Sequence, residues 1–164
     1  MKRCRISPEE AGGMNVCAFL DTIAWSEGTD TPGQPSRDRG YDVLAGGGNF
    51  SDYDDHPRQL IFLPTLGVKS SAAGRYQLLE RYYDVYRRLL KLQNFSPAAQ
   101  DRIAVQQIRE QKALPLIQAG DFVAAAEAMS FIWPSLPGAG GGQHEHSLDD
   151  LLAMYQQVGG VVTA

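Results

Sequence analysis

The sequence lacks the features that would place it in several common protein classes. Its two cysteines, Cys4 and Cys17, have no CxxC spacing and no histidines at zinc-finger intervals, so we expect free thiols and no structural zinc. No apolar run approaches the roughly 20 residues of a transmembrane helix, and neither a GxSxG motif nor a phosphate-binding loop occurs. The net charge of −4 gives no general electrostatic reason to bind nucleic acid or an anionic membrane. We therefore expect neither a nucleic-acid partner nor stable membrane insertion.

The chain has the length and composition of one soluble globular domain. Its 164 residues are 43% hydrophobic and 21% charged, and such a chain can form a sizeable core. The basic first residues run into Pro8, Glu9 and Glu10 rather than into an apolar stretch. We therefore expect residues 1–14 to be a flexible N-terminal extension and residues 15–164 to form a single domain, by default a monomer.

A helical repeat of apolar residues opens this domain. They recur at i, i+3, i+4, i+7 and i+8, the stripe of an amphipathic helix, and are Val16, Phe19, Leu20, Ile23 and Ala24. Asn15 is placed to cap the start of the helix, and Gly28 to end it. Glu27 falls on the same stripe at the last helical turn.

The next segment changes character. Residues 28–73 are rich in Gly, Asp, Pro and Ser, and "GYDVLAGGGNF" has the strand core and Gly-rich turn of a hairpin. A further strand is expected at "QLIFL", which lies between Pro57 and Pro64. We therefore expect a small β-rich lobe over about residues 28–73.

The second half of the chain has helical spacing and helix-capping residues. We expect helices over residues 74–92, over 97–112 after a Ser96 cap, from Ala113 to Gly120, after Asp121, and after Ser147. The fold class is then α+β, with a mainly helical lobe and a small sheet lobe. A cleft between the two lobes is the natural place for a ligand.

Glu27 is the first candidate for chemistry. A carboxyl on an apolar helix face loses solvation, and the negative end of the helix dipole also disfavours its charged form. Both effects raise the pKa, as a general acid for glycosidic cleavage requires. Helical spacing alone leaves a second interpretation open, in which the carboxylate reaches water at the helix end.

Other residue types give weaker candidates. The stretch "SDYDDHP" and the segment "HEH" at residues 144–146 place carboxylates beside histidines, but neither has the spacing of an EF-hand or a zincin. We expect structural or solvated roles for both and no metal. Trp25, Trp133 and the tyrosines can stack on sugars or pack in the core.

Several motifs in order carry a resemblance to a known family. They are "AFLDTIAWSEGTD", "RGYDVLAGG", "SDYDDHPRQL", "SSAAGRYQLL", "FSPAAQDRIAVQQI" and "WPSLPGAGGGQHEHSLDDLLAMY". Together they closely resemble the phage lambda-type endolysins, which are lytic transglycosylases of peptidoglycan. The resemblance covers about residues 17–158.

The resemblance implies a lysozyme-like fold around a glycan-binding cleft and a single catalytic acid, the Glu of "WSEGT", here Glu27. It implies cleavage of the β-1,4 bond between N-acetylmuramic acid and N-acetylglucosamine without water, leaving a 1,6-anhydro end. The partner is the peptidoglycan glycan strand, and no cofactor is implied. The enzyme would accumulate in the host cytoplasm until release through a holin-type pore.

The resemblance also implies substrate-binding residues. Tyr76 and Gln77, in "GRYQ", are expected at the cleft wall, and Gln143 in a flexible lip. Tyr41 and Asp42 are expected to face the cleft, and Asp42 is the candidate for a second carboxylate if the enzyme is a hydrolase. Gly141 departs from the family pattern, in which this lip position is aromatic ("GAGYGQ").

Two other functions stay open at this point. A hydrolytic muramidase on the same scaffold would use water as the acceptor. A catalytically silent glycan-binding module of a phage would bind the glycan without cleaving it, and Glu27→Gln would then leave lysis unchanged.

Overall fold

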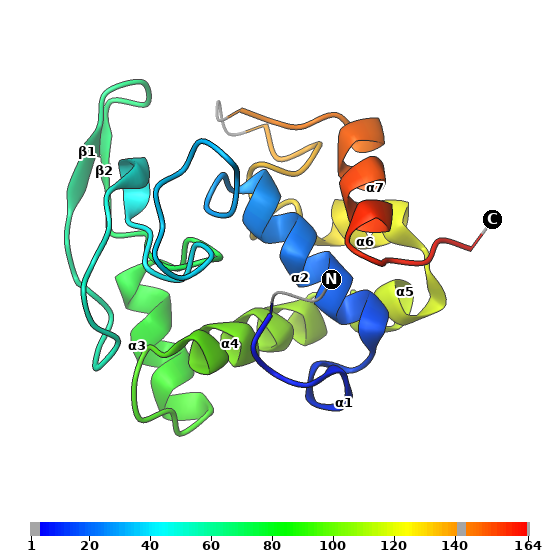
Figure 1. The fold of residues 1–164 in the computed structure, drawn as a ribbon, viewed down its shortest axis with the longest axis horizontal. Helices are drawn as coiled ribbons and strands as arrows, with labels where there is room; N and C mark the ends of the chain where they lie inside the picture. The colour runs from blue at the N-terminus through cyan, green and yellow to red at the C-terminus, as the bar shows by residue number, and fades with distance from the viewer. Residues whose placement is uncertain (1–3, 141–143, 164) are drawn as a thin grey trace.

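A computed structural model describes residues 4–140 and 144–163 of the chain. The fold is mainly helical, with a two-stranded antiparallel sheet at one end of the molecule (Figure 1). Within these residues no helix is both long and apolar enough to cross a bilayer.

Helix α2 (Met14–Ser26) is the central element of the structure. Ten of its 13 residues are buried, including the whole predicted apolar stripe. It contacts α1 (Pro8–Ala11), α4 (Pro97–Glu110), α5 (Leu114–Ala119) and α7 (Leu148–Gln157), and Figure 1 shows it crossing the middle of the molecule. The core that these helices share therefore forms around α2.

The beginning of α2 differs from the prediction. Gly13 rather than Asn15 is the N-cap residue, and Asn15 lies within the first turn. The Asn15 side chain instead bonds the backbone of Val161 in both directions, at 3.1 and 2.9 Å. The Asn15 side chain, which the sequence pattern predicts as a local helix cap, therefore makes a tertiary contact instead.

The expectation of a flexible extension is wrong for residues 4–13. Cys4, Ile6 and Ala11 are buried in the main core, and Ser7 caps the short helix α1. The backbone N–H groups of Arg5 and Ile6 both donate to Oδ2 of Asp101, at 2.5 and 3.1 Å. Apolar anchors and satisfied backbone donors therefore hold this segment in place.

The β-rich lobe has fewer strand residues than the sequence indicates. Strands β1 (Ile61–Leu63) and β2 (Val68–Ser70) form the sheet, with Ile61 opposite Ser70. The predicted hairpin in "GYDVLAGGGNF" reduces to a single bridge between Val43 and Asn49 around the 3₁₀ turn η1 (Ala45–Gly47). Gly46 and Gly47 have φ angles of 78° and 93° there, which interrupt a regular ladder.

Helix α3 (Glu80–Leu89) begins later than predicted. Gly74 and Gln77 have φ angles of 81° and 52°, so residues 74–79 form a looped segment rather than the first turns of a helix. Leu78 in this segment and Ala73 just before it close the loop, because the backbone N–H of each donates to the carbonyl of the other. This irregular segment carries two of the predicted site residues, Tyr76 and Gln77.

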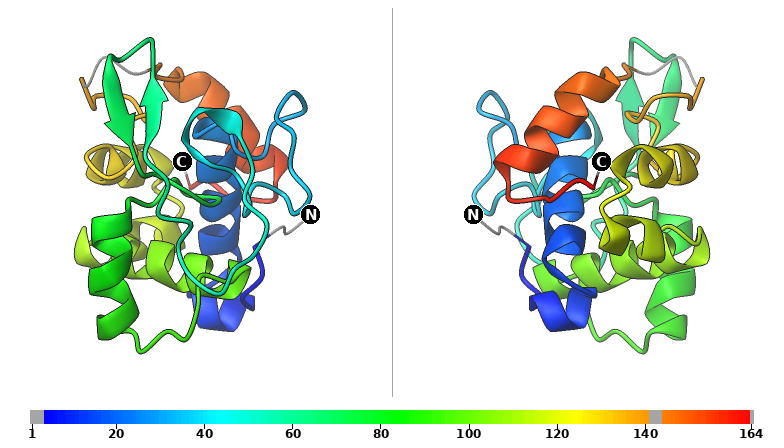
Figure 2. Two further views of the ribbon diagram at one scale, coloured as in Figure 1. Left: turned by 90° about the vertical axis from the view of Figure 1, so that its left-hand side faces the viewer. Right: turned by 90° about the vertical axis from the view of Figure 1, so that its right-hand side faces the viewer.

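The later helices agree with the prediction at their capped ends. Ser96 accepts a hydrogen bond from the Ala99 N–H at the start of α4. In the same way, Asp121 caps α6 (Phe122–Met129) and Ser147 caps α7, each by accepting from the backbone N–H three residues later. Gly120 ends α5 in the left-handed conformation with φ 79°. Figure 2 shows the β1–β2 hairpin and helix α1 at opposite ends of the molecule, with α2 running between them.

Candidate active site

A cleft of about 790 Å³ lies between the β lobe and the helical lobe. Its lining comes from the hairpin, the segment before α3, the start of α3, and the residues after α6. The polar and aromatic side chains among the lining residues are Glu27, Thr65, Ser70, Tyr76, Gln77, Arg81, Tyr82, Gln107, Phe131, Trp133 and His144. Glu27 is the one carboxylate that the described residues contribute to this cleft.

Glu27 sits at the C-terminal end of α2. It is the C-cap residue, and its backbone N–H still donates to the Ile23 carbonyl. Gly28, with φ 76°, then turns the chain away, as the sequence predicts. The half-buried side chain therefore continues the buried stripe of α2 and reaches the cleft.

Two serines support the Glu27 carboxyl. Ser135 Oγ donates to Oε1 of Glu27 at 2.6 Å, and the Ser26 and Ser135 hydroxyls are 2.5 Å apart. Burial raises the pKa of Glu27 above its ordinary value, while the hydrogen bonds from Ser135 partly oppose this. The raised pKa is the direction predicted from the sequence and keeps the group available as a proton donor.

Tyr76 forms part of the cleft wall and is fixed at both ends. Its hydroxyl donates to Oδ1 of Asp101 at 2.6 Å, and its carbonyl accepts the indole N–H of Trp133 at 3.1 Å. Trp133 itself is buried. The same contact thus links the segment before α3 to the chain after α6, the two parts of the cleft that face Glu27.

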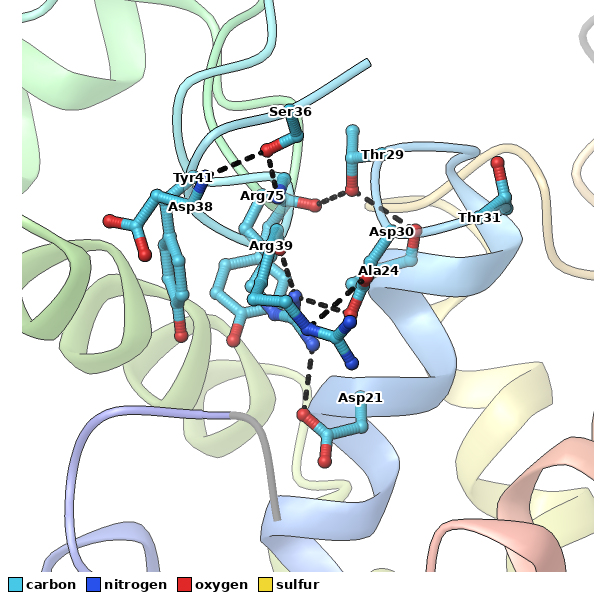
Figure 3. Close-up of polar contacts among 12 residues, drawn as sticks. Asp21, Ala24, Thr29, Asp30, Thr31, Ser36, Asp38, Arg39, Tyr41 and Arg75 are labelled. Atoms are coloured by element: carbon cyan, nitrogen blue, oxygen red, sulfur yellow. Dashed lines mark hydrogen bonds and ion pairs between the residues drawn. The ribbon is translucent and has the colours of Figure 1, made fainter. Parts of the chain in front are cut away.

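A buried ion cluster fixes this wall to α2. The Arg75 guanidinium is fully buried and pairs with Asp21 on α2 and Asp30 just beyond it, each at 2.9 Å (Figure 3). Thr29 adds a hydrogen bond from its hydroxyl to the Arg75 carbonyl at 2.6 Å. Since Arg75 precedes Tyr76 in the chain, the cluster ties the segment that carries Tyr76 to α2 and the residues just after it.

Gln77 also lines the cleft, next to Tyr76. Its side-chain amide donates to the carbonyls of Gly74 at 3.0 Å and Val43 at 3.3 Å. The structure therefore brings Glu27, Tyr76 and Gln77 together around one cavity. Contact of the last two with a glycan stays a prediction.

The structure does not place Tyr41 and Asp42 in the cleft. Tyr41 is fully buried, and its hydroxyl donates to Asp101 at 2.7 Å beside that of Tyr76. Asp42 is also fully buried and accepts hydrogen bonds from Ser36 Oγ at 2.5 Å and from the backbone and side chain of Arg37. These two expectations were wrong because the irregular backbone directs Tyr41 into the main core and Asp42 toward Ser36 and Arg37.

Asp42 also has the electrostatics of a structural carboxylate. Burial alone would raise its pKa, but the hydrogen bonds from Ser36 and Arg37 lower the pKa below its ordinary value. The group is therefore ionised and fully engaged in holding residues 36–42. It does not meet Glu27 in the cleft as a second catalytic carboxylate.

The remaining candidates fall into two groups. Gln143 and Gly141 lie outside the described residues. His56 is buried against Tyr83 and Phe95, and His146 packs on Trp25 with its Nε2 3.1 Å from the Ser26 carbonyl. Across residues 4–140 and 144–163, no group of three or more His, Cys, Asp or Glu side chains is arranged to hold a metal ion.

The sequence reasoning missed Ser26 and Ser135. Ser26 directly precedes Glu27, but its partner lies 109 positions away, and a helical pattern gives no sign of such a contact. The signal that could have found Ser135 is its place in "WPSLPG", one of the motifs that carry the resemblance.

Comparisons with known proteins agree with this geometry. The family model described as "Endolysin" matches residues 17–162. The endolysin of Escherichia phage lambda is 56% identical over 88% of this chain and 91% of its own length, and that of Escherichia phage P2 is 46% identical over 90% and 94%.

Solved structures show the same relationship. A structure described as bacteriophage lambda lysozyme complexed with a chitohexasaccharide superposes with a TM-score of 0.88 at 50% identity, covering 97% of this chain and 99% of that one. A second structure, lysozyme from bacteriophage lambda, gives a TM-score of 0.84 at 49% identity with the same coverage. The fold is therefore lysozyme-like, as the sequence analysis predicted.

Proposed function

The chain belongs to the endolysin family of peptidoglycan-degrading phage enzymes, and we propose that it cleaves the glycan by non-hydrolytic transglycosylation with Glu27 as the acid and base. The bond broken joins C1 of N-acetylmuramic acid to O4 of N-acetylglucosamine. The observation that carries the proposal is the single carboxylate in the cleft, Glu27, with Asp42 buried elsewhere. Hydrolysis by the usual glycosidase mechanism needs a pair of carboxyl groups on either side of the bond.

The proposed reaction returns the proton to its starting place. The protonated Glu27 gives its proton to the bridging oxygen as the bond from C1 breaks. The resulting carboxylate then takes the proton from the 6-hydroxyl of the same muramic acid, whose oxygen attacks C1. A 1,6-anhydro ring forms, N-acetylglucosamine leaves with a free 4-hydroxyl, and no water enters the reaction.

The site suits the two roles of Glu27. Burial keeps the carboxyl protonated to a higher pH than in water, which favours the first step. The Ser135 hydroxyl, 2.6 Å from Oε1, stabilises the carboxylate that exists between the two proton transfers. Burial favours the protonated form of Glu27 and the Ser135 hydrogen bond favours the carboxylate. A single group can therefore alternate between the two forms.

The proposed ligand is an N-acetylated glycan strand lying along the cleft. A relative with the same fold was solved with a chitohexasaccharide, a chain of N-acetylglucosamine units. We propose that Tyr76 and Gln77 contact the strand, because both line the cavity that holds Glu27.

Product analysis tests the chemistry. Purified murein is digested with the wild-type protein and with the Glu27→Gln variant, and the masses of the fragments are measured by mass spectrometry. We expect 1,6-anhydro ends from the wild type and a loss of about 10²–10⁴-fold in rate for the variant. Hydrated reducing ends would instead show a muramidase, and unchanged lysis by Glu27→Gln would show a protein that does not act through this group.

We further propose that the enzyme accumulates in the host cytoplasm and reaches the wall through a holin-type pore. This rests on membership of a phage family that acts on the wall. The test is expression in a host with and without a co-expressed pore-forming protein. Lysis without any pore or membrane damage would contradict the proposal.

A further inference from the structure

Phe131 stands out among the apolar side chains of the protein. It is 86% exposed, the largest value for any large hydrophobic residue among the described part of the chain. It also belongs to the lining of the cleft that contains Glu27. Folding gains little from a phenyl ring left in water, since apolar side chains contribute to stability mainly when they are buried. An exposed ring is not unusual by itself, but this one also lines the cleft, where a ligand can cover it.

The backbone that carries Phe131 is firmly held. The N–H groups of Ile132 and Trp133 both donate to the Met129 carbonyl, and the Leu136 N–H donates to that of Trp133. Trp133 and Leu136 are buried. The fixed turn holds the backbone of Phe131 at the cleft, so a ligand that binds the ring has to order only its side-chain torsions.

A second exposed ring belongs to another wall of the same cleft. Tyr82, in the first turn of α3, is 44% exposed, and the Arg81 guanidinium lies 4.9 Å from its ring centre. Both Arg81 and Tyr82 line the cavity. The cleft thus has aromatic and hydrogen-bonding groups at its helical-lobe side. The loop at 137–146 contributes no Phe, Tyr or Trp of its own.

We propose that Phe131 is a glycan-binding residue that packs against the apolar face of one sugar ring of the bound glycan. A pyranose has a face of C–H groups that suits contact with an aromatic ring, and its rim carries the hydroxyls and acetamido groups that polar neighbours can bind. This inference rests on the proposed function, since it takes a glycan strand as the ligand of the cleft. It adds a binding role for a residue outside the catalytic group.

The binding test uses chitohexaose and a background that cannot turn over substrate. Affinities are measured by calorimetry for Glu27→Gln alone and combined with Phe131→Ala, Phe131→Leu or Phe131→Trp. We expect Phe131→Ala to weaken binding about 2- to 13-fold, the range for loss of one aromatic contact. Phe131→Trp should retain the affinity, and Phe131→Leu should fall between, because it keeps apolar area without a ring.

Phe62 provides a matched control. It is also an exposed phenylalanine, at 56%, but it lies on β1 and is not part of the cleft lining, whereas its neighbour Leu63 is. Adjacent side chains of a strand point to opposite faces, so Phe62→Ala should leave chitohexaose affinity unchanged. An equal loss for Phe62→Ala would overturn the assignment to Phe131.

Kinetics on murein separate this inference from the proposed chemistry. Phe131→Ala with an intact Glu27 should raise KM with kcat within about twofold, since the ring binds the strand and takes no part in proton transfer. Wild-type affinity and KM in Phe131→Ala would overturn the inference while anhydro products still supported transglycosylation. Hydrated products would overturn transglycosylation whatever the result at Phe131.

Discussion

Glu27 experiences opposing influences on its charge. Burial disfavours the carboxylate, and the Ser135 hydroxyl favours it, with burial the larger effect. The folded protein therefore binds a proton at Glu27 more tightly than the unfolded chain does. The proposed reaction would use the group in both its protonated and its ionised form.

The first prediction concerns the stability of Glu27→Gln. A raised pKa means that Glu27 costs no stability below its ordinary value of about 4.5 and destabilises the folded state as pH rises through its folded pKa. Gln cannot ionise, so the variant should melt higher than the wild type at pH 7 and the same at pH 3.5. Thermal unfolding followed by circular dichroism at both pH values measures this. A lower melting temperature at pH 7 would contradict the burial of the charge.

Ser135→Ala makes a complementary prediction for activity. The substitution removes a donor that lowers the pKa of Glu27, so the pKa should rise further. Activity then persists to higher pH before it falls, and kcat drops about tenfold because the carboxylate intermediate loses a hydrogen bond. The pH–rate profile on murein tests both effects. Ser130→Ala, at an exposed helix end whose hydroxyl bonds the Glu127 carbonyl, is the control and should leave the profile unchanged.

At this scale the sequence was informative about one residue and misleading about two. The position of Glu27 followed from helical spacing, since every turn of α2 repeats the same geometry. Tyr41 and Asp42 lie in irregular backbone, where no period tells which way a side chain points. Ser135 meets Glu27 across 108 positions, a contact that depends on how the end of α2 packs beside the chain after α6.

At the scale of elements, one buried arginine joins α2 to the cleft wall. Arg75 belongs to the looped segment 74–79, whereas Asp21 lies on α2 and Asp30 follows it. Burying these charges is costly unless they are paired. The cluster therefore fixes one arrangement of the two elements and penalises others.

Arg75→Met should destabilise the protein strongly. It leaves the Asp21 and Asp30 carboxylates without their shared buried cation, a change that typically costs about 3–5 kcal/mol. The control is Arg102→Met, which removes an exposed ion pair to Glu10 and should cost less than about 1 kcal/mol. Urea unfolding measures both. Equal effects would mean that the buried cluster does not set the stability of this region.

Element boundaries were predictable where capping residues mark them. Ser96, Asp121 and Ser147 each cap the helix that follows, as a short local signal can indicate. The helix expected from residue 74 failed because its apolar spacing does not reveal left-handed backbone at Gly74 and Gln77. The segment before α2 was wrongly predicted to be flexible. Its three buried residues, Cys4, Ile6 and Ala11, are widely spaced among charged residues and form no periodic pattern.

At the scale of the molecule, the cleft forms only when segments that are far apart in the sequence come together in the folded protein. Its lining runs from Glu27 to His144. A ligand that fills such a cleft in the folded state alone must shift the unfolding equilibrium toward that state.

Chitohexaose should therefore raise the melting temperature. At 100 times its Kd the stabilisation is about 2.7 kcal/mol, or on the order of 5–10 °C for a chain of this size. Maltohexaose, which lacks acetamido groups, is the control and should give no comparable shift. Differential scanning calorimetry measures both, and equal shifts for the two sugars would contradict a cleft selective for N-acetylated glycans.

The pairing of Asn15 with Val161 has a consequence for synthesis of the protein on the ribosome. Helix α2 emerges early, but its first turn bonds a residue 146 positions later and the helix packs on α7. In a growing chain α2 therefore lacks these partners until α7 and residue 161 have been synthesised. Glu27 likewise acquires its Ser135 partner late, so shorter nascent chains carry Glu27 without its folded surroundings.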